Sequence, residues 1–581
     1  MDQRNLILAI VLSVTILLTF QIFFAPTPPD PGTQATTATG ETLPGGGDAE
    51  VPQLPGGSAV GTAGDGISRD KALEESPRVT ITSPKLSGSL SLQGGRIDDL
   101  ILKSYRETIE PDSPLITLLS PPDAPNPYYA DFGWTATDSS VILPGHDTLW
   151  ETDGNTLSPG KPITLTWDNG EGLVFERELE LDPEYLFTVT QRVVNNSDQP
   201  VTLSPYGLIS RTGTPPVLGF YILHEGLIGV FDGTLKEVDY DDLQDIGVQA
   251  QDTTGGWIGI TDKYWLTALV PDQESPVKTR FVHRLKDGID KYQTDYLYEP
   301  ITIAAGETGS TTGRLFAGAK KVLLLNEYEE LYNIKRFDLA VDFGWFYFLT
   351  KPLFYLLHWL GEVTGNFGIA ILIATVMIKT CFFPLANKSY VSMAKMRKLQ
   401  PKMVELRERF GDDKQRLNQE MMGLYKKESV NPLSGCLPII IQIPVFFALY
   451  KVLFVSIEMR QAPFYGWIHD LSAPDPTSIL NGFGLFPWVV PNLGALDIIN
   501  IGVWPLLMGI TMFLQQRLNP QPPDPIQAKI FLFMPIMFTF LLARFPAGLV
   551  IYWTWNNLLS ITQQAVIMKR AGVPLGRQKK T

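Results

Sequence analysis

The chain has 581 residues, 44% of them hydrophobic, and a formal net charge of −14. This length indicates roughly two to four domains. Two cysteines and five scattered histidines exclude a disulfide-held external domain and offer too few ligands for a metal site. A Walker-type glycine-rich loop is missing from the sequence, which excludes a P-loop ATPase. Residues 26–335 are acidic and strand-like, whereas 344–568 consist mainly of apolar runs.

The first 25 residues predict a transmembrane anchor. The apolar run from Leu6 to Ala25 approaches the ~20 residues that a membrane-spanning helix needs. Phe23 stands where a signal-peptide cleavage site requires a small residue, so we expect no cleavage. Residues 26–75 are rich in Pro, Gly and Thr and predict a flexible linker.

Residues 76–335 predict a large antiparallel β domain, since short alternating or β-branched runs are separated by turn signals such as Asp168–Gly170. The clearest strand candidates are Val79–Thr82, Ser89–Leu92, Ile163–Trp167, Tyr185–Val193 and Trp265–Val270. The region shows no nucleophile motif. A structural or interaction role is therefore favoured over a carbohydrate-active enzyme.

An aromatic-rich segment at 336–362 predicts an interfacial amphipathic helix. Its sequence from Phe343 to Leu360 is broken by the polar residues Thr350, Lys351 and His358. Aromatic side chains with polar breaks are typical of a helix lying at a membrane surface. A plain buried helix is the alternative.

Five further apolar spans, at 363–384, 433–456, 501–516, 528–544 and 547–568, bring the predicted transmembrane helices to six. Basic residues concentrate in 385–432 and in the tail 569–581, whereas Arg460 is the only Lys or Arg in 457–500. Because Lys and Arg near span ends stay in the cytoplasm, both termini are predicted to be cytoplasmic and the β domain external.

Lys379 lies inside the second span, where a charge costs about 2.5–3.5 kcal/mol. One alternative is a lysine that snorkels to the cytoplasmic surface. The other is a wet groove within the membrane, because Thr375 lies one turn away and later spans also carry polar side chains. The polar candidates from those spans include Gln442, Gln515 and Asn556.

Residues 385–432 predict a charged helical hairpin, since apolar residues step by three or four on either side of a break at Gly411–Asp413. The candidate contact residues are the methionines Met393, Met396, Met403 and Met421. Such a seam either joins the two helices or adapts to varied partners. The basic outer face could meet anionic lipid, ribosomal RNA or a partner protein.

Several strings resemble the YidC/Oxa/Alb family of membrane protein insertases. They are Tyr390–Lys402, Gly411–Arg416, Asn431–Pro438, Arg460–Pro463, Trp467–Ser472 and Phe545–Leu549. Gly255–Trp257 with Tyr264 fits the periplasmic domain of the Gram-negative members. The resemblance implies a polytopic α-helical protein of the bacterial inner membrane, with a periplasmic β-supersandwich similar to sugar-mutarotase domains and a cytoplasmic helical hairpin. It also implies insertion of nascent membrane proteins, alone or with the Sec translocon, without enzymatic activity or cofactor.

The chain departs from the family at three places. Lys379 stands where an arginine is common, which keeps the charge and loses bidentate carboxylate pairing. Trp553, beside Tyr552, replaces a frequent tyrosine in the last span, and both join the expected groove residues. The segment 481–503 is longer than the family's usual connection.

The expected function is therefore an insertase and chaperone for transmembrane segments. A hydrophilic groove would shorten the path of a polar flank through hydrocarbon. The hairpin would receive the chain, and the basic tail would hold the ribosome electrostatically. The alternative, a secondary transporter of a small solute, normally shows internal repeats and paired broken helices, neither of which is visible here.

Overall fold

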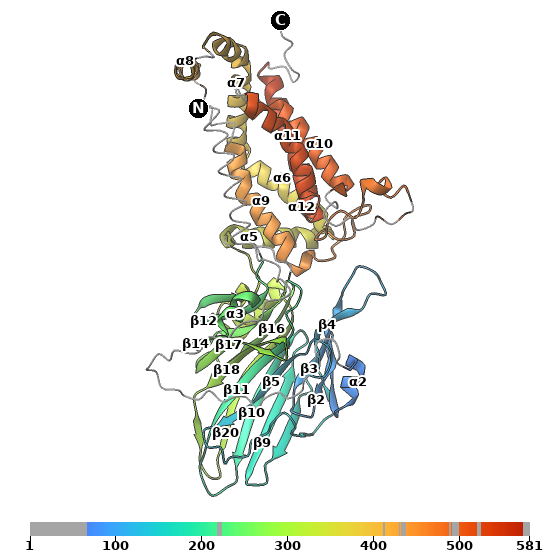
Figure 1. Cartoon of the computed structure of the whole chain (residues 1–581), viewed down its shortest axis with the longest axis vertical. Coiled ribbons are helices and arrows are strands. Elements are labelled where there is room, and N and C mark those ends of the chain that lie inside the picture. Colours follow the sequence, from blue (N-terminus) through green and yellow to red (C-terminus); the bar gives the residue numbers. More distant parts are fainter. Residues whose placement is uncertain are drawn as a thin grey trace.

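The computed structural model describes residues 67–217, 223–344, 346–410, 413–428, 430, 437–486, 488, 490, 499–519 and 525–572. The predicted anchor, most of the linker 26–75 and residues 573–581 of the basic tail lie outside the described residues, as does much of the segment 481–503. The described chain forms a β domain followed by a bundle of helices (Figure 1).

One sheet of the β domain contains eleven strands. Its main path, in spatial order, is β14 (Val248–Thr254), β17 (Pro276–Lys286), β18 (Ile289–Tyr298), β11 (Val201–Thr212), β5 (Tyr128–Ala136), β3 (Ile97–Arg106), β2 (Leu86–Ser91), β1 (Arg78–Thr82) and β7 (Thr156–Leu157). Off this path, β19 (Ile301–Ile303) pairs with β11 and β4 (Leu115–Leu119) pairs with β3. The pairings are antiparallel except for β1 with β7.

The other sheet contains nine strands. Their order is β13 (Thr234–Asp239), β12 (Gly226–Phe231), β15 (Trp257–Thr261), β16 (Trp265–Val270), β20 (Thr308–Ala319), β10 (Leu186–Asn195), β9 (Leu173–Leu181), β8 (Ile163–Asp168) and β6 (Glu151–Thr152). A short helix, α3 (Tyr240–Ile246), connects β13 to β14.

Alternating burial explains why these segments form strands. In β9 every second residue is buried, including Leu173, Phe175 and Leu179, as expected for a strand with one face on the core. The core that the two sheets share contains large buried aromatic side chains such as Phe187 and Phe281. All five strand candidates fall on strands, so the prediction of an all-β domain is confirmed.

The described end of the predicted linker is not flexible chain but a short helix, α2 (Arg69–Glu74). Arg69 pairs with Asp99 of β3, whose side chain is almost fully buried. A buried carboxylate requires a partner, and this ion pair holds α2 against the sheet.

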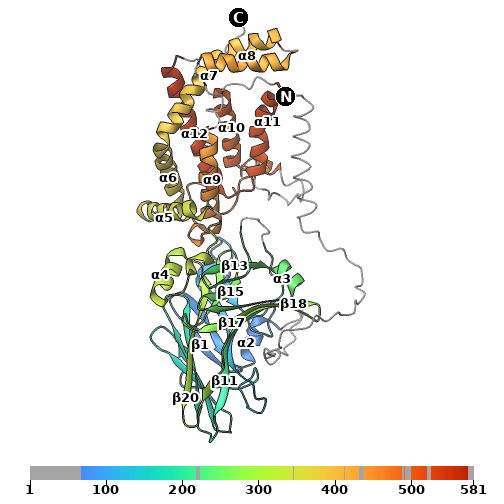
Figure 2. The ribbon, with the colours of Figure 1, turned by 90° about the vertical axis from the view of Figure 1, so that its left-hand side faces the viewer.

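The chain leaves the β domain through α4 (Val322–Tyr332) and the 3₁₀ turn η1 (Phe337–Ala340) and enters α5 (Tyr347–Thr364). Figures 1 and 2 show α5 lying across the end of the bundle that faces the β domain. One side of α5 buries Leu353, Phe354 and Leu357, whereas Phe348 and Trp359 are exposed. The predicted amphipathic helix is therefore present.

The bundle consists of α6 (Phe367–Cys381), α9 (Leu437–Val455), α10 (Val503–Leu518), α11 (Pro525–Leu542) and α12 (Ala547–Arg570). The helix of the predicted span 363–384 begins at Phe367, four residues after the predicted start. The reason is that α5 first ends at its C-cap Gly365, which has a left-handed φ of 66°. Asn366 then caps α6, since its side chain accepts a hydrogen bond from the Ile369 N–H at 3.1 Å.

Within the described residues, length and composition qualify no single helix as a membrane span. Only α6 together with α7 (Phe383–Phe410) passes that test, and the two are bent by 69° relative to each other.

The predicted hairpin is present as α7 and α8 (Lys414–Lys427), at the end of the bundle away from the β domain (Figure 2). Asp413 caps α8 by accepting from the Arg416 N–H at 3.0 Å. The hairpin seam consists of Leu399, Met403, Met421 and Val430 with Met396, Leu406, Leu417, Leu424 and Tyr425.

The first half of α7 belongs to the bundle rather than to the seam. Tyr390 and Met393 pack against Ile567 of α12, and Ala394 packs against Met568. The expectation that Met393 lies in the seam is wrong, because α12 reaches this part of α7 and covers its apolar side.

Candidate functional site

Lys379 lies in the last turn of α6 and reaches α12. Its Nζ donates a hydrogen bond to Ser560 Oγ at 2.7 Å, and this hydroxyl in turn donates to the Asn556 carbonyl at 2.8 Å. Among the described residues, no carboxylate pairs with the ammonium group of Lys379. Its positive charge therefore has a polar neighbour without being neutralised.

Thr375, one turn before Lys379, does not take part in this contact. It is 2% exposed, and its Oγ1 donates to the Ile371 carbonyl of its own helix at 2.6 Å. Helical threonines commonly satisfy their hydroxyl in this way. The expectation that Thr375 offers a polar group to a groove is thus not supported.

Polar side chains on α12 connect this helix to its neighbours. Gln442 of α9 donates to the Tyr552 hydroxyl, and Asn557 Nδ2 donates to Thr511 Oγ1 of α10 at 3.3 Å. Gln564 Nε2 donates to the Leu518 carbonyl at 3.2 Å. Tyr552, Asn556, Ser560 and Gln564 recur every four residues, so they lie along one side of α12.

Several buried polar atoms near this row have no hydrogen-bond partner among the described residues. They are Asn556 Oδ1, Gln564 Oε1, Gln563 Nε2, Trp555 Nε1 and Gln516 Oε1. Leaving such an atom unsatisfied costs about 1–3 kcal/mol. The row is thus a place that favours water or polar peptide groups.

Two other expected groove residues have different surroundings. The ring of Trp553 packs against Phe446 of α9 and Phe538 of α11, with centroid distances of 4.6 and 6.1 Å. Trp553 therefore joins helices by aromatic packing. Gln515 is half-buried on α10 and does not take part in the contact between Lys379 and Ser560.

An apolar surface accompanies the polar row. On α11 the exposed side chains include Phe533, Ile536 and Met537, and on α9 they include Ile443 and Phe447. Apolar side chains exposed along one helix face are typical of contact with lipid or with another apolar helix.

Three of the expected hairpin methionines, Met396, Met403 and Met421, pack into the seam, where they join α7 to α8. Met422, which sequence analysis did not select, is 61% exposed on α8. Ser560 was also missed, although its position four residues after Asn556 placed it on the polar side of α12.

Known proteins resemble the chain over nearly its whole length. The membrane protein insertase YidC of Beijerinckia indica is 51% identical over 98% of this chain and 96% of its own. The chain belongs to the YidC family of membrane protein insertases. The membrane protein insertase YidC of Granulibacter bethesdensis is 50% identical over 99% of both chains.

Two family models match the β domain and the helical part of the chain separately. Residues 78–356 match the YidC periplasmic domain, and residues 359–573 match the 60Kd inner membrane protein. A solved structure, an active YidC insertase crystal structure with the first transmembrane domain resolved, is 16% identical, with a TM-score of 0.35 over 84% of this chain and 92% of that one. Membership of the YidC family confirms the expected insertase and sets aside the transporter alternative; its members are not enzymes.

Proposed function

We propose that this YidC-family chain inserts nascent membrane proteins, its clients, through a hydrophilic groove between α6, α9 and α12. The observation that carries the proposal is Lys379, a cation on an apolar helix that hydrogen-bonds to Ser560 at 2.7 Å and has no carboxylate partner among the described residues. A charge kept in such surroundings is a mark of function.

The groove would lower the barrier that hydrocarbon presents to a client's polar flank. Water or peptide groups would satisfy Asn556 Oδ1 and Gln564 Oε1, which have no partner among the described residues. Lys379 would attract acidic flanks, because two opposite charges interact more strongly in a medium of low dielectric constant. The polar flank would thus cross a shorter apolar distance.

The apolar part of the client would leave along α9 and α11. Their exposed side chains, such as Ile443 and Phe533, offer a surface to a helix on its way into lipid. This step needs no nucleotide, since transfer of an apolar helix into hydrocarbon is itself favourable.

The proposed topology has six transmembrane helices, both termini in the cytoplasm and the β domain in the periplasm. The domains would be an anchor at 1–25, a linker at 26–75, the β domain at 76–335, an interfacial helix at 336–362, the insertase core at 363–568 and a tail at 569–581. The exposed aromatic side of α5, with Phe348 and Trp359, supports its place on the outer leaflet.

The proposed cytoplasmic partner is the ribosome. Lys395, Lys398, Lys426 and Lys427 are exposed on the hairpin and would attract ribosomal RNA. Met422 would contact apolar client segments, because methionine adapts to varied surfaces. The Sec translocon is the proposed membrane partner for clients whose insertion needs both the translocon and this protein.

Depletion of the protein in its own host tests the proposal. Small inner-membrane proteins with a short translocated flank should fail to insert, whereas soluble periplasmic proteins should still be exported. Re-expression of the wild-type chain should restore insertion. Normal insertion of every small client after complete depletion would overturn the proposal.

A further inference from the structure

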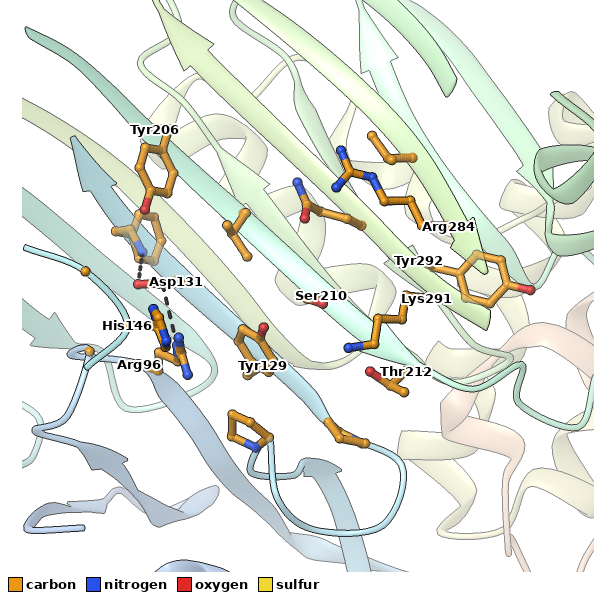
Figure 3. A pocket seen from close by; sticks show the side chains of 18 of the residues that line it. Arg96, Tyr129, Asp131, His146, Tyr206, Ser210, Thr212, Arg284, Lys291 and Tyr292 are labelled. Carbon is orange, nitrogen blue, oxygen red and sulfur yellow. Dashed lines mark hydrogen bonds and ion pairs between the residues drawn. The ribbon is translucent and has the colours of Figure 1, made fainter. Parts of the chain in front are cut away.

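The β domain contains a second polar site, a pocket of about 230 Å³ on one face of the eleven-stranded sheet. Neighbouring strands supply it in rows set by their register. Tyr129 of β5, Ser210 of β11 and Gln293 of β18 are paired in one row. Thr212, Lys291 and Arg284 are paired in the next, on β11, β18 and β17. Figure 3 shows these strands side by side under the lining side chains.

A buried charge cluster forms the inner end of the pocket. Asp131 lies between two cations, with Arg96 Nε at 3.6 Å and Arg177 Nη1 at 3.8 Å (Figure 3). Arg177 is 3% exposed and donates to the backbone carbonyls of Gly95, at 2.5 Å, and of Phe132. The Phe132 N–H also donates to Asp131 Oδ1 at 2.8 Å, so this bond and the two cations hold the Asp131 carboxylate in the wall of the pocket.

The outer end is strongly basic. Arg280 is held by Asp295 through two hydrogen bonds of 2.9 and 3.1 Å, and Gln293 Nε2 donates to the same carboxylate. Arg284 and Lys286 are exposed, and Lys291 is half-buried beside them. Burial and then the charge of Lys286 lower the pKa of Lys291, while Asp287 opposes them. The six cations of the lining exceed the carboxylates Asp131, Asp295 and Asp287.

We infer that this pocket binds an anionic sugar, a hydroxylated ring that carries a phosphate or carboxylate group. The ring hydroxyls would donate to Asp131 and bond with Gln293 and Ser210, beside the aromatic ring of Tyr129. The anionic group would lie between Arg284 and Lys291, which face each other across β17 and β18.

Two other ligand classes fit the site less well. A peptide bound as an added strand needs a free sheet edge. Here β5, β11, β18 and β17 are each hydrogen-bonded to a strand on both sides. A bare phosphate ion would fill only part of the 230 Å³.

Isothermal titration of the full chain in nanodiscs tests the inference, with glucose 6-phosphate and glucuronate as probes. Glucose, inorganic phosphate and an acidic tetrapeptide serve as comparisons. Both anionic sugars should bind at least about tenfold more tightly than glucose or phosphate. Glucose lacks the anionic group that would contact Arg284 and Lys291, and phosphate lacks the hydroxylated ring. The double variant Arg284→Ala/Lys291→Ala should lose about tenfold in affinity for the anionic sugars.

Lys278→Ala is the matched control, since Lys278 is exposed on the same strand and lies outside the pocket. It should leave binding unchanged. Equal binding of inorganic phosphate and glucose 6-phosphate, preferred binding of the peptide, or an unaffected double variant would each overturn the inference. Lack of binding by both anionic sugars would overturn it as well.

Discussion

Glu458 joins the helical bundle to the β domain by accepting a hydrogen bond from the Val322 N–H at 3.3 Å. Glu458 follows α9, and Val322 begins α4. Its second carboxylate oxygen, Oε2, is buried without a hydrogen-bond partner among the described residues. Nearby, Arg460 Nη2 donates to the Arg106 carbonyl at 2.6 Å, and Lys451 pairs with Asp342 at 2.7 Å. The two parts of the molecule therefore meet through charged groups, of which Glu458 Oε2 and the Lys451–Asp342 pair are largely shielded from solvent.

This junction should weaken as pH rises. Burial raises the pKa of Glu458 from 4.5 to about 7, against the opposing hydrogen bonds and Lys321. Between these values the folded protein binds more protons than the unfolded chain, so the free energy of unfolding falls with rising pH and levels off above about 7. Thermal unfolding across this window should show Tm falling by a few degrees.

Glu458→Gln should reduce this pH dependence without abolishing it, because burial also raises the pKa of Asp98 in the β domain to about 6. Glu171→Gln, at an exposed turn of the β domain, is the control and should retain the wild-type slope. A wild-type Tm that rises over the same pH range would contradict the raised pKa.

The charge of Lys379 should matter most for clients with acidic flanks. Lys379→Arg should keep insertion, whereas Lys379→Ala and Lys379→Glu should reduce insertion of an acidic-flank client severalfold and of a neutral-flank client less. Protease protection of a client pair that differs only in flank charge measures this.

Lys388→Ala, which removes an exposed cation from α7, is the matched control for Lys379 and should behave as wild type. If Lys379→Ala inserts both clients as well as the parent does, Lys379 is only a snorkelling residue. Ser560→Ala leaves the charge in place and should be milder than Lys379→Ala.

The paired part of the hairpin should be needed for client reception. Replacing 398–428 by a short linker should abolish insertion, while leaving Tyr390, Met393 and Ala394 packed against α12. Crosslinking between bundle helices should show that the core still assembles. Normal insertion by this deletion would show that the paired hairpin is dispensable.

Two methionines should separate hairpin stability from client contact. Met403→Ala removes a buried seam residue and should destabilise the hairpin by about 2–5 kcal/mol. Met422→Ala should leave stability within about 0.5 kcal/mol and reduce photocrosslinking of clients to α8. Unchanged crosslinking in the Met422 variant would place the client elsewhere.

Most of the β domain should be dispensable for insertion. Deletion of 78–319 keeps α4 and retains the ion pairs Lys351–Asp338, at 2.6 Å, and Lys451–Asp342, at 2.7 Å. Insertion of small clients should therefore stay close to the wild-type level. Complete loss of insertion, with the truncated protein present in normal amount, would contradict this prediction.

Local patterns in the sequence predicted the strands of the β domain and the helices of the hairpin. Alternating or β-branched residues made Ile163–Trp167 and Tyr185–Val193 recognisable as strands, and the sequence break at Gly411–Asp413 marked the start of the second hairpin helix, α8. Such signals depend on neighbours within one or two turns of chain, so the sequence contains them directly. The span that includes Lys379 was visible for the same reason.

The partners of each side chain were decided by the packing of distant segments. Lys379 meets Ser560, 181 residues later, and Met393 packs on α12 instead of α8. Thr375 shares a helical face with Lys379, yet it bonds to its own backbone. The sugar pocket likewise exists only because strand register brings Asp131, Ser210 and Lys291 to one face. Helix period and strand alternation specify which way a side chain points, but the element that it meets depends on how all the elements pack together.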